Sequence, residues 1–189
     1  MNAKDSADQP IVLTGFMATG KTTVGRILAR RLGFDFVDTD AVIEDRHGPI
    51  AQIFAEQGEA TFRRIEREVA AELASRTRTV IATGGRMMLD PHNVASLGHH
   101  GRVYCLWAEA EQIVARLRAD PSAMERPMLA GSDPDQRMRD LLAERAPGYG
   151  QFAQVPTSGR SPEEIADELA RLVRSQPASA AALVPGCEL

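Results

Sequence analysis

The sequence predicts a three-layer α/β/α fold, in which helices cover both faces of a parallel sheet of about five strands. Two observations favour this class. Short apolar runs, each long enough for one buried strand, alternate with longer segments of helical periodicity. A glycine-rich turn also separates the first apolar run from the first helix. The 189 residues are enough for one domain with a substantial core.

The first strand is expected at Ile11, Val12 and Leu13, and the residues that follow form a phosphate-binding loop. Gly15–Thr23 fits the pattern G-x-x-x-x-G-K-[ST]. Its glycines allow consecutive backbone N–H groups to turn toward phosphate oxygens, and the next helix adds its partial positive charge there. That helix has an apolar face and a glycine stop, formed by Val24, Ile27, Leu28, Leu32 and Gly33.

Strands and helices then alternate to the end of the domain. Proline and acidic caps mark two helix starts, at Asp90-Pro91 and at Ser161-Pro162-Glu163-Glu164. Further strands are expected at residues 35–40, 79–83 and 103–107 and around Val155. Further helices are expected at residues 41–46, 50–56, 109–119 and 135–145, with a longer one opening at Gly58 and others after Asp90 and Ser161.

We expect one domain at residues 11–174, between a disordered tail at 1–10 and a flexible tail at 175–189. Residues 120–134 interrupt the pattern with three prolines and a glycine around Arg126. A segment of this length and composition inside a compact domain predicts a mobile lid.

Composition argues against several classes of partner. The net charge is −4, which disfavours a nucleic-acid or membrane surface as the main partner. Two cysteines do not make a disulfide framework. No apolar stretch approaches the ~20 residues of a membrane span, and the N-terminus lacks a signal-peptide core. A cytoplasmic enzyme is the simplest interpretation.

A phosphate-binding loop alone indicates a nucleotide site, which could serve a switch, a motor or a kinase. Lys21 would reach the β- and γ-phosphates, and the Thr22 hydroxyl would ligate Mg²⁺. Asp38 and Asp40 flank one residue, so on an extended strand both side chains would face the same way. One carboxylate could hold the metal's water shell and the other could take a substrate proton. Either could instead be a helix cap.

Three arginines at predicted loops and helix ends are candidates for anion binding. Arg63, Arg126 and Arg145 could bind a carboxylate bidentately or stabilise a transferring phosphoryl group. Each one alone is more often a solvated surface residue. The sequence does not show whether the three converge.

Several motifs follow one another in order from about Ile11 to Val173. They are Gly15-Phe16-Met17 with Gly20-Lys21-Thr22, Asp38-Thr39-Asp40, Phe62-Arg63, Gly84-Gly85, Arg126-Pro127 and Arg145-Ala146-Pro147-x-Tyr149. With these motifs the chain resembles the shikimate kinases, a family of P-loop kinases. The resemblance implies ATP- and Mg²⁺-dependent phosphorylation of the 3-hydroxyl of shikimate, in chorismate and aromatic amino-acid biosynthesis. We also expect a monomer.

The resemblance also implies roles for individual residues. Thr22 and Asp38 would place Mg²⁺, and Lys21, Asp40 and Arg126 would be catalytic, with Asp40 as the base. The shikimate site would use a region at about residues 39–67, with Asp40, Arg63, Gly84, Gly85 and Arg145 as substrate-binding residues. Nucleotide binding would use Gly15, Ala18, Thr19, Gly20, Lys21, Thr22, Thr23, Arg116, Arg126 and Arg160.

Two residues depart from the family's pattern. Ala18 replaces a glycine, which is compatible with the loop if φ is negative there. Arg86 replaces the third glycine after the third strand, where it could clash, contact a carboxylate or point into solvent. Arg86 leaves open a kinase for another small polyol, such as gluconate or a cyclitol. A nucleotide-binding module without catalysis is a further alternative, disfavoured by the intact catalytic set.

Overall fold

β1 lies at the centre of a five-stranded parallel sheet. The computed structural model describes residues 8–119 and 133–175. The strand order is β2-β3-β1-β4-β5, and all four pairings are parallel. The predicted sheet is therefore confirmed, with strands β1 (Ile11–Thr14), β2 (Asp35–Asp38), β3 (Thr79–Ala82), β4 (Arg102–Trp107) and β5 (Ala153–Pro156).

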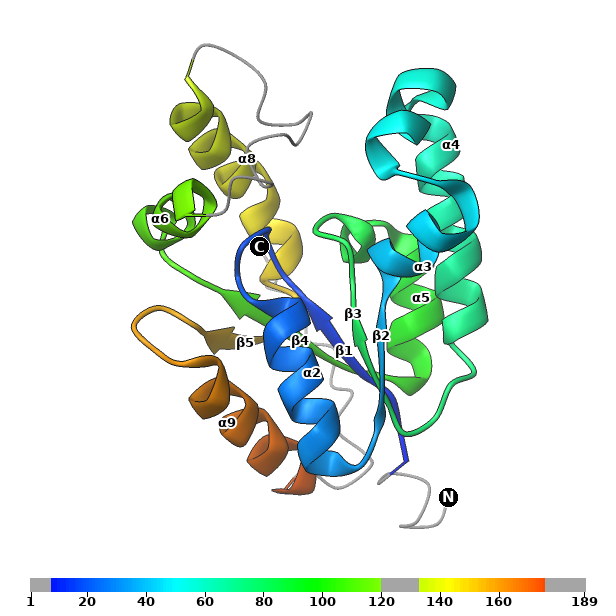
Figure 1. Cartoon of the computed structure of the whole chain (residues 1–189). Coiled ribbons are helices and arrows are strands. Elements are labelled where there is room, and N and C mark those ends of the chain that lie inside the picture. Colours follow the sequence, from blue (N-terminus) through cyan, green and yellow to red (C-terminus); the bar gives the residue numbers. More distant parts are fainter. Residues whose placement is uncertain (1–7, 120–132, 176–189) are drawn as a thin grey trace, which may run out of the picture.

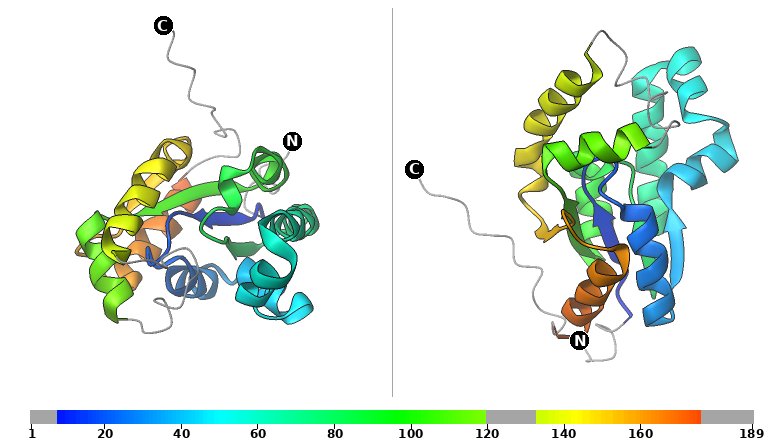
Figure 2. Two further views of the ribbon diagram at one scale, coloured as in Figure 1. Left: turned by 90° about the horizontal axis from the view of Figure 1, so that it is seen from above. Right: turned by 60° about the vertical axis from the view of Figure 1, so that its left-hand side comes forward.

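Helices cover both faces of this sheet, so the three-layer architecture is confirmed as well (Figures 1 and 2). α2 and α9 lie side by side on one face. α3, α4 and α5 cover the other face at the β2 side, and α6 and α8 lie beside the carboxyl end of β4. The helices are α2 (Lys21–Leu32), α3 (Thr39–His47), α4 (Ile50–Leu73), α5 (Pro91–His100), α6 (Ala110–Ala119), α8 (Pro134–Tyr149) and α9 (Pro162–Ser175), with a 3₁₀ turn η1 (Met87–Leu89).

The side-chain alternation of β1 divides the core into two layers. All four residues of β1 are buried, as expected for a central parallel strand. Ile11 and Leu13 pack with α2 and α9, whereas Val12 faces the cluster formed by α3, α4 and α5. A third cluster contains Phe16 and Met17 of the loop after β1 and packs it against α6 and α8. The phosphate-binding loop therefore rests on core.

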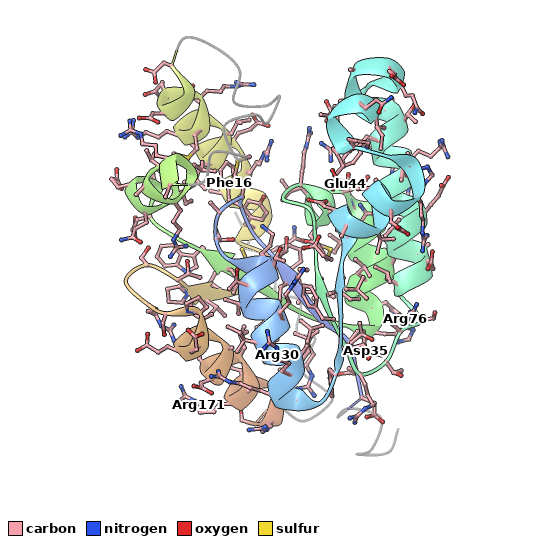
Figure 3. The ribbon with its side chains drawn as sticks, viewed as in Figure 1. Phe16, Arg30, Asp35, Glu44, Arg76 and Arg171 are labelled. Carbon is pink, nitrogen blue, oxygen red and sulfur yellow. The ribbon has the colours of Figure 1, made fainter. Side chains whose placement is uncertain are left out.

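The parallel register brings three chain segments to the same edge of the sheet. Leu13 and Asp38 both pair with Ala82, so β1, β2 and β3 end level with one another. Figure 3 shows Phe16, just after β1, at this carboxyl edge, with Asp35 at the opposite edge. Ligands of open parallel sheets bind outside the carboxyl ends of the strands. The candidate site residues from these segments are therefore neighbours.

One expected strand is shorter than predicted, and this corrects the argument about its two acids. β2 ends at Asp38, and Asp40 lies in the first turn of α3. The cause is Asp38 itself, whose side chain accepts hydrogen bonds from the backbone N–H groups of Asp40 and Ala41 and caps the helix. The expectation that both carboxylates project from an extended strand is therefore wrong.

Other boundaries differ in smaller ways. α4 contains the two helices expected around Gly58, and they meet at a break where Gly58 has φ 79 and ψ 168. α8 continues past Arg145 and through Pro147 to Tyr149. Residues 8–10 of the expected N-terminal tail bond to the sheet, since Asp8 and Pro10 accept backbone N–H groups of Arg78 and Arg102.

Some expectations fall outside the described residues. They are the tail residues 1–7 and 176–189, most of the expected lid, and Arg126 within it. Among the helices of residues 8–119 and 133–175, none combines the length and apolar character that crossing a bilayer requires.

Gly33, the expected stop of the first helix, offers a test of this fold. It caps α2 with φ 67, and a Cβ there would meet only the Arg78 side chain, at 3.9 Å. Gly33→Ala should lower the free energy of unfolding by about 1–2 kcal/mol, because a left-handed backbone strains a side chain. Urea denaturation measures the change.

Gly98 provides the matched control. It lies inside α5, and a Cβ there would make only ordinary contacts at 3.9 Å with Val103 and Val94. Gly98→Ala should raise the free energy of unfolding by about 0.5–1 kcal/mol, because alanine is the better helix former. Equal effects of the two substitutions would contradict the assigned backbone conformations.

Candidate active site

The loop after β1 has the geometry of an anion site. α2 begins at Lys21 after Gly20, without a side-chain cap and with no acidic residue in its first turn. Its first backbone bond runs from the Val24 N–H to the Gly20 carbonyl, so the N–H groups of Lys21, Thr22 and Thr23 precede the helical ladder. Donors and a positive helix end therefore converge at the loop, as phosphate binding requires.

The backbone conformation of the loop explains why Gly15 is a glycine, and it corrects the expectation for Ala18. Gly15 has φ 130, and a Cβ there would lie 2.1 Å from the Leu106 carbonyl oxygen, so only glycine fits. Ala18 has φ 58, so the expectation of a negative φ at this position is wrong. The left-handed conformation costs a non-glycine residue roughly 1–2 kcal/mol. The hydrogen bond from Arg116 Nη1 to the Ala18 carbonyl, 3.1 Å long, helps to hold it.

Lys21 is folded over the loop that precedes it. Its Nζ donates to the carbonyl oxygens of Gly15 at 2.9 Å and Phe16 at 2.8 Å. Thr19, buried beneath, donates its hydroxyl to the same Phe16 carbonyl at 2.8 Å. The ammonium group is thus held beside the backbone donors of the loop, where it would meet a bound phosphate chain.

Thr22 and Asp38, the expected metal pair, are in direct contact. The Thr22 hydroxyl donates to Asp38 Oδ2 at 2.7 Å, while Oδ1 caps α3. One hydroxyl and one carboxylate beside a phosphate loop suit Mg²⁺, which binds few protein ligands and keeps water and phosphate oxygens. Among the residues the structure describes, no group of three or more His, Cys, Asp or Glu side chains could hold a metal ion.

Asp40 packs against the glycine pair after β3. An added Cβ on Gly84 would lie 2.6 Å from Asp40 Oδ1 and 3.3 Å from Glu66 Oε1. The Gly84 N–H donates to the buried Thr39 hydroxyl at 2.9 Å, which ties this turn to the start of α3. The Asp40 carboxylate therefore occupies space that a side chain at position 84 would need.

Gly85, the next residue after Gly84, lies close to the phosphate loop. A Cβ on Gly85 would be 3.7 Å from the Met17 nitrogen and 3.9 Å from the Gly15 carbonyl oxygen. On its other side, the Gly85 carbonyl accepts a hydrogen bond from the Tyr149 hydroxyl of α8. Burial raises the pKa of Tyr149 to about 12, so this hydroxyl keeps its proton and remains a donor.

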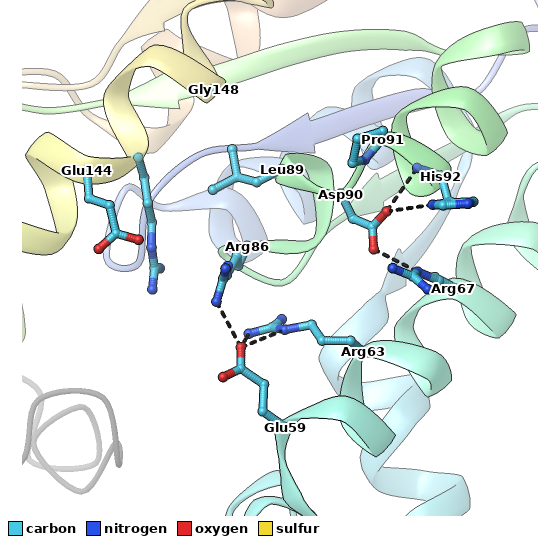
Figure 4. Close-up of a pocket in the computed structure, with 11 residues that line it drawn as sticks. Glu59, Arg63, Arg67, Arg86, Leu89, Asp90, Pro91, His92, Glu144 and Gly148 are labelled. Carbon is cyan, nitrogen blue, oxygen red and sulfur yellow. Dashed lines mark hydrogen bonds and ion pairs between the residues drawn. The ribbon is translucent and has the colours of Figure 1, made fainter.

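Arg63 and Arg145 line one pocket. From the sequence, only the family resemblance placed them in the same site. The pocket has a volume of about 550 Å³ and lies between α4 and α8, also bordered by Arg67 and Arg86 (Figure 4). Arg145 is buried, with its guanidinium carbon 5.6 Å from the centre of the Phe16 ring. Arginines from two separate helices therefore face a shared space, which favours an anionic group there.

Glu66 is a site residue that sequence reasoning missed. Its side chain is buried and accepts a 2.6 Å hydrogen bond from Arg63 Nη1. Burial, more than the opposing effect of Arg63, raises its pKa to about 7, and the charges of Asp40 and Asp90 add to the increase. The spacing of three residues after Arg63 was the available signal, because such pairs meet on a helix.

The two remaining nucleotide candidates have different surroundings. Arg116 donates to the Ala18 carbonyl and to both the hydroxyl and the carbonyl of Thr157, so it joins the phosphate loop to the segment after β5. Arg160 pairs with Glu168 at 2.5 Å and donates to the Pro156 carbonyl. Arg116 thus contacts the loop directly, whereas the bonds of Arg160 run to β5 and α9.

Comparisons with known proteins agree with this arrangement. A family model described as shikimate kinase matches residues 17–174. The chain is 46% identical over 175 residues to a shikimate kinase of Synechococcus sp., covering 88% of this chain and 90% of the relative. A solved shikimate kinase of Acinetobacter baumannii in complex with shikimate superimposes with a TM-score of 0.83 at 36% identity, covering 92% of this chain and 98% of that one.

A solved structure of lower sequence identity is named as a different kinase. A gluconokinase from Sinorhizobium meliloti superimposes with a TM-score of 0.60 at 20% identity, covering 88% of this chain and 94% of the other. At that identity the likeness concerns the fold alone. The match over residues 17–174 and the 46% identical relative carry the assignment. The chain belongs to the shikimate kinase family.

Proposed function

We propose that this protein transfers the γ-phosphoryl group of ATP to the 3-hydroxyl of shikimate, giving shikimate 3-phosphate and ADP. The observation that carries the proposal is the position of the Gly84-Gly85 turn. It lies against the phosphate loop through Gly85 and against Asp40 through Gly84, and Tyr149 bonds it to the helix of Arg145. A nucleotide site, a carboxylate and an arginine-lined pocket therefore adjoin one another.

The residues suit phosphoryl transfer, which depends on positioning and charge neutralisation. The loop of Gly15–Thr23 and Lys21 would bind the phosphates. Asp40 would accept the proton of the attacking hydroxyl as it bonds to phosphorus. Thr22 and Asp38 would hold Mg²⁺, which neutralises charge on the phosphate oxygens when bound. Arg116 supports the loop at the nucleotide side, and a contact of Arg160 with the nucleotide remains a prediction.

The pocket suits the other end of the substrate. Shikimate carries its carboxylate on a ring carbon two positions away from the carbon whose hydroxyl is phosphorylated, so the two groups project from different parts of the ring. Arg63 and Arg145, which line the pocket, would bind that carboxylate. Gly84 and Gly85, which directly precede the pocket residue Arg86 in the chain, would contact the ring. Both arginines lie on rigid helices, which keeps the clamp well defined. The region at about residues 39–67 would then act as the substrate-binding part of the domain at residues 11–174.

Some assignments rest on the family alone. Arg126 lies outside the described residues, and we retain it as a catalytic residue on a lid at about residues 120–134. We also propose that the protein is a cytoplasmic monomer in chorismate and aromatic amino-acid biosynthesis, acting on a small molecule and on neither nucleic acid nor membranes. Sedimentation of the purified protein tests the monomer.

The function is tested by a coupled ADP-release assay with ATP, Mg²⁺ and a panel of shikimate, gluconate and a cyclitol. We expect turnover with shikimate to exceed that with the other two by at least about 100-fold in kcat/KM. A cyclitol has no carboxylate and would leave the arginine charges unpaired, and the open chain of gluconate would not hold its carboxylate and hydroxyl in the positions that a ring fixes. Preferred turnover of gluconate would favour the second candidate, a related polyol kinase, which Arg86 in place of the family's third glycine leaves open.

Asp40→Asn tests the proposed base. The amide keeps the shape of the side chain but cannot take a proton, so kcat should fall by at least about 100-fold. Affinity for a non-hydrolysable ATP analogue should stay unchanged. Asp45→Asn, an exposed change on the same helix, is the control. If kcat survived in Asp40→Asn, Asp40 would be a substrate contact only.

Arg63→Lys and Arg145→Lys test the carboxylate clamp. Lysine keeps the charge but loses the planar fork. Each change should cost about 1.5–3 kcal/mol, which raises the KM for shikimate roughly ten- to a hundredfold. The KM for ATP should not move. Arg64→Lys, on the outer side of α4 where Arg64 pairs with Glu68, is the control. An unmoved KM in both variants would place the carboxylate elsewhere.

A further inference from the structure

Arg86, which stands where related kinases are expected to have a glycine, bonds across to another part of the site. Its backbone has φ −119, so a side chain causes no strain at this position. The guanidinium Nη1 donates to Glu59 Oε1 at 2.8 Å, as Figure 4 shows. This bond runs from the turn after β3 to the part of α4 that follows the break at Gly58. Arg86 therefore neither clashes nor simply points into solvent.

The same Glu59 oxygen also holds Arg63. Arg63 donates to Glu59 Oε1 through Nε at 3.1 Å and through Nη2 at 3.0 Å. On its other side, Arg63 Nη1 donates to Glu66 Oε2 at 2.6 Å. The carboxylates of Glu59 and Glu66 thus both accept hydrogen bonds from the planar guanidinium group of Arg63, which lies four residues after the first and three residues before the second. Its direction toward the pocket is set by these two partners.

The charge of Glu59 explains why a cation beside it matters. Glu59 is about half exposed and borders the pocket that would receive an anionic substrate. Without Arg86, its negative charge would be shared only with Arg63 and would repel a substrate carboxylate. Arg86 neutralises this charge and fixes the position of the oxygen that Arg63 uses.

We propose that Arg86 is a positioning residue for substrate binding, which orients Arg63 by holding Glu59 rather than by contacting the substrate. The proposal rests on the proposed function, because it concerns the pocket for the substrate carboxylate. It assigns Arg86 a role in affinity for a carboxylate substrate and none in the chemical step.

The test compares Arg86→Ala in two backgrounds, the wild type and Glu59→Ala. In the wild-type background, the KM for shikimate should rise about two- to fivefold, the range for one partly exposed ion pair, with kcat and the KM for ATP unchanged. In the Glu59→Ala background, the same change should leave the KM for shikimate unaltered. Arg86→Lys should recover most of the lost affinity, because it keeps a cation beside Glu59.

The pair formed by Arg64 and Glu68 provides the control, because it lies on the same helix and is also exposed, with a 2.5 Å contact. Arg64→Ala, alone or with Glu68→Ala, should leave every kinetic constant unchanged. A KM unaffected by Arg86→Ala overturns the proposal. An equal rise in both backgrounds also overturns it, since Arg86 would then act on the substrate directly, and so does a loss confined to kcat.

Failure of the proposed function gives a different result. The wild-type enzyme would then not phosphorylate shikimate, whereas failure of the Arg86 proposal leaves that activity intact. If the wild type prefers another carboxylate substrate of the panel, the same variants are measured with that substrate, and the same outcomes decide the role of Arg86. If no carboxylate substrate turns over, both proposals are overturned.

Discussion

The rest of the site depends on the hydrogen bonds that the Asp38 carboxylate accepts. Its Oδ2 accepts the Thr22 hydroxyl from the phosphate-binding helix, and its Oδ1 caps the helix that carries Asp40. One side chain therefore links the helix after the phosphate-binding loop to the start of the helix that carries Asp40, the proposed base. Asp38 can do this because β2 and β3 end level beside the central β1.

Around this link, glycines allow backbone and carboxylate groups to approach closely. Gly15 lets the phosphate loop turn against the carbonyl of Leu106, and Gly84 leaves room for Asp40. In both places a methyl group would occupy space already filled by oxygen. Ala18 shows that the loop tolerates one strained non-glycine residue where Arg116 supports its carbonyl.

Several arginines that line the pocket are paired with acidic residues of the same chain. Arg63 is held by Glu59 and Glu66, and Arg67 is paired with Asp90 at 2.7 Å. These ion pairs keep several guanidinium groups close together despite their mutual repulsion. Acidic residues of the same chain thus hold the arginine side chains in place. Arg86 is accommodated in the same way, because it pairs with Glu59.

The sequence by itself determined the nucleotide half. The strand, loop and helix around Gly15–Thr23 are local in sequence, and their residues can be predicted from periodicity, turn chemistry and one spacing pattern. The five strands and the pairing of Thr22 with Asp38 were also expected. The end of β2 was not, because the competing cap by Asp38 depends on its side-chain geometry rather than on periodicity.

Which residues meet at the proposed substrate pocket was decided only by the tertiary structure. Arg63 and Arg145 are 82 residues apart in the sequence and lie on different helices. Only the packing of α4 and α8 around one edge of the sheet brings them to one pocket. The burial of Glu66 and the contact of Arg86 with Glu59 likewise depend on that packing. Local patterns predict which residues carry charge, but which charges meet is set by long-range contacts that no local pattern contains.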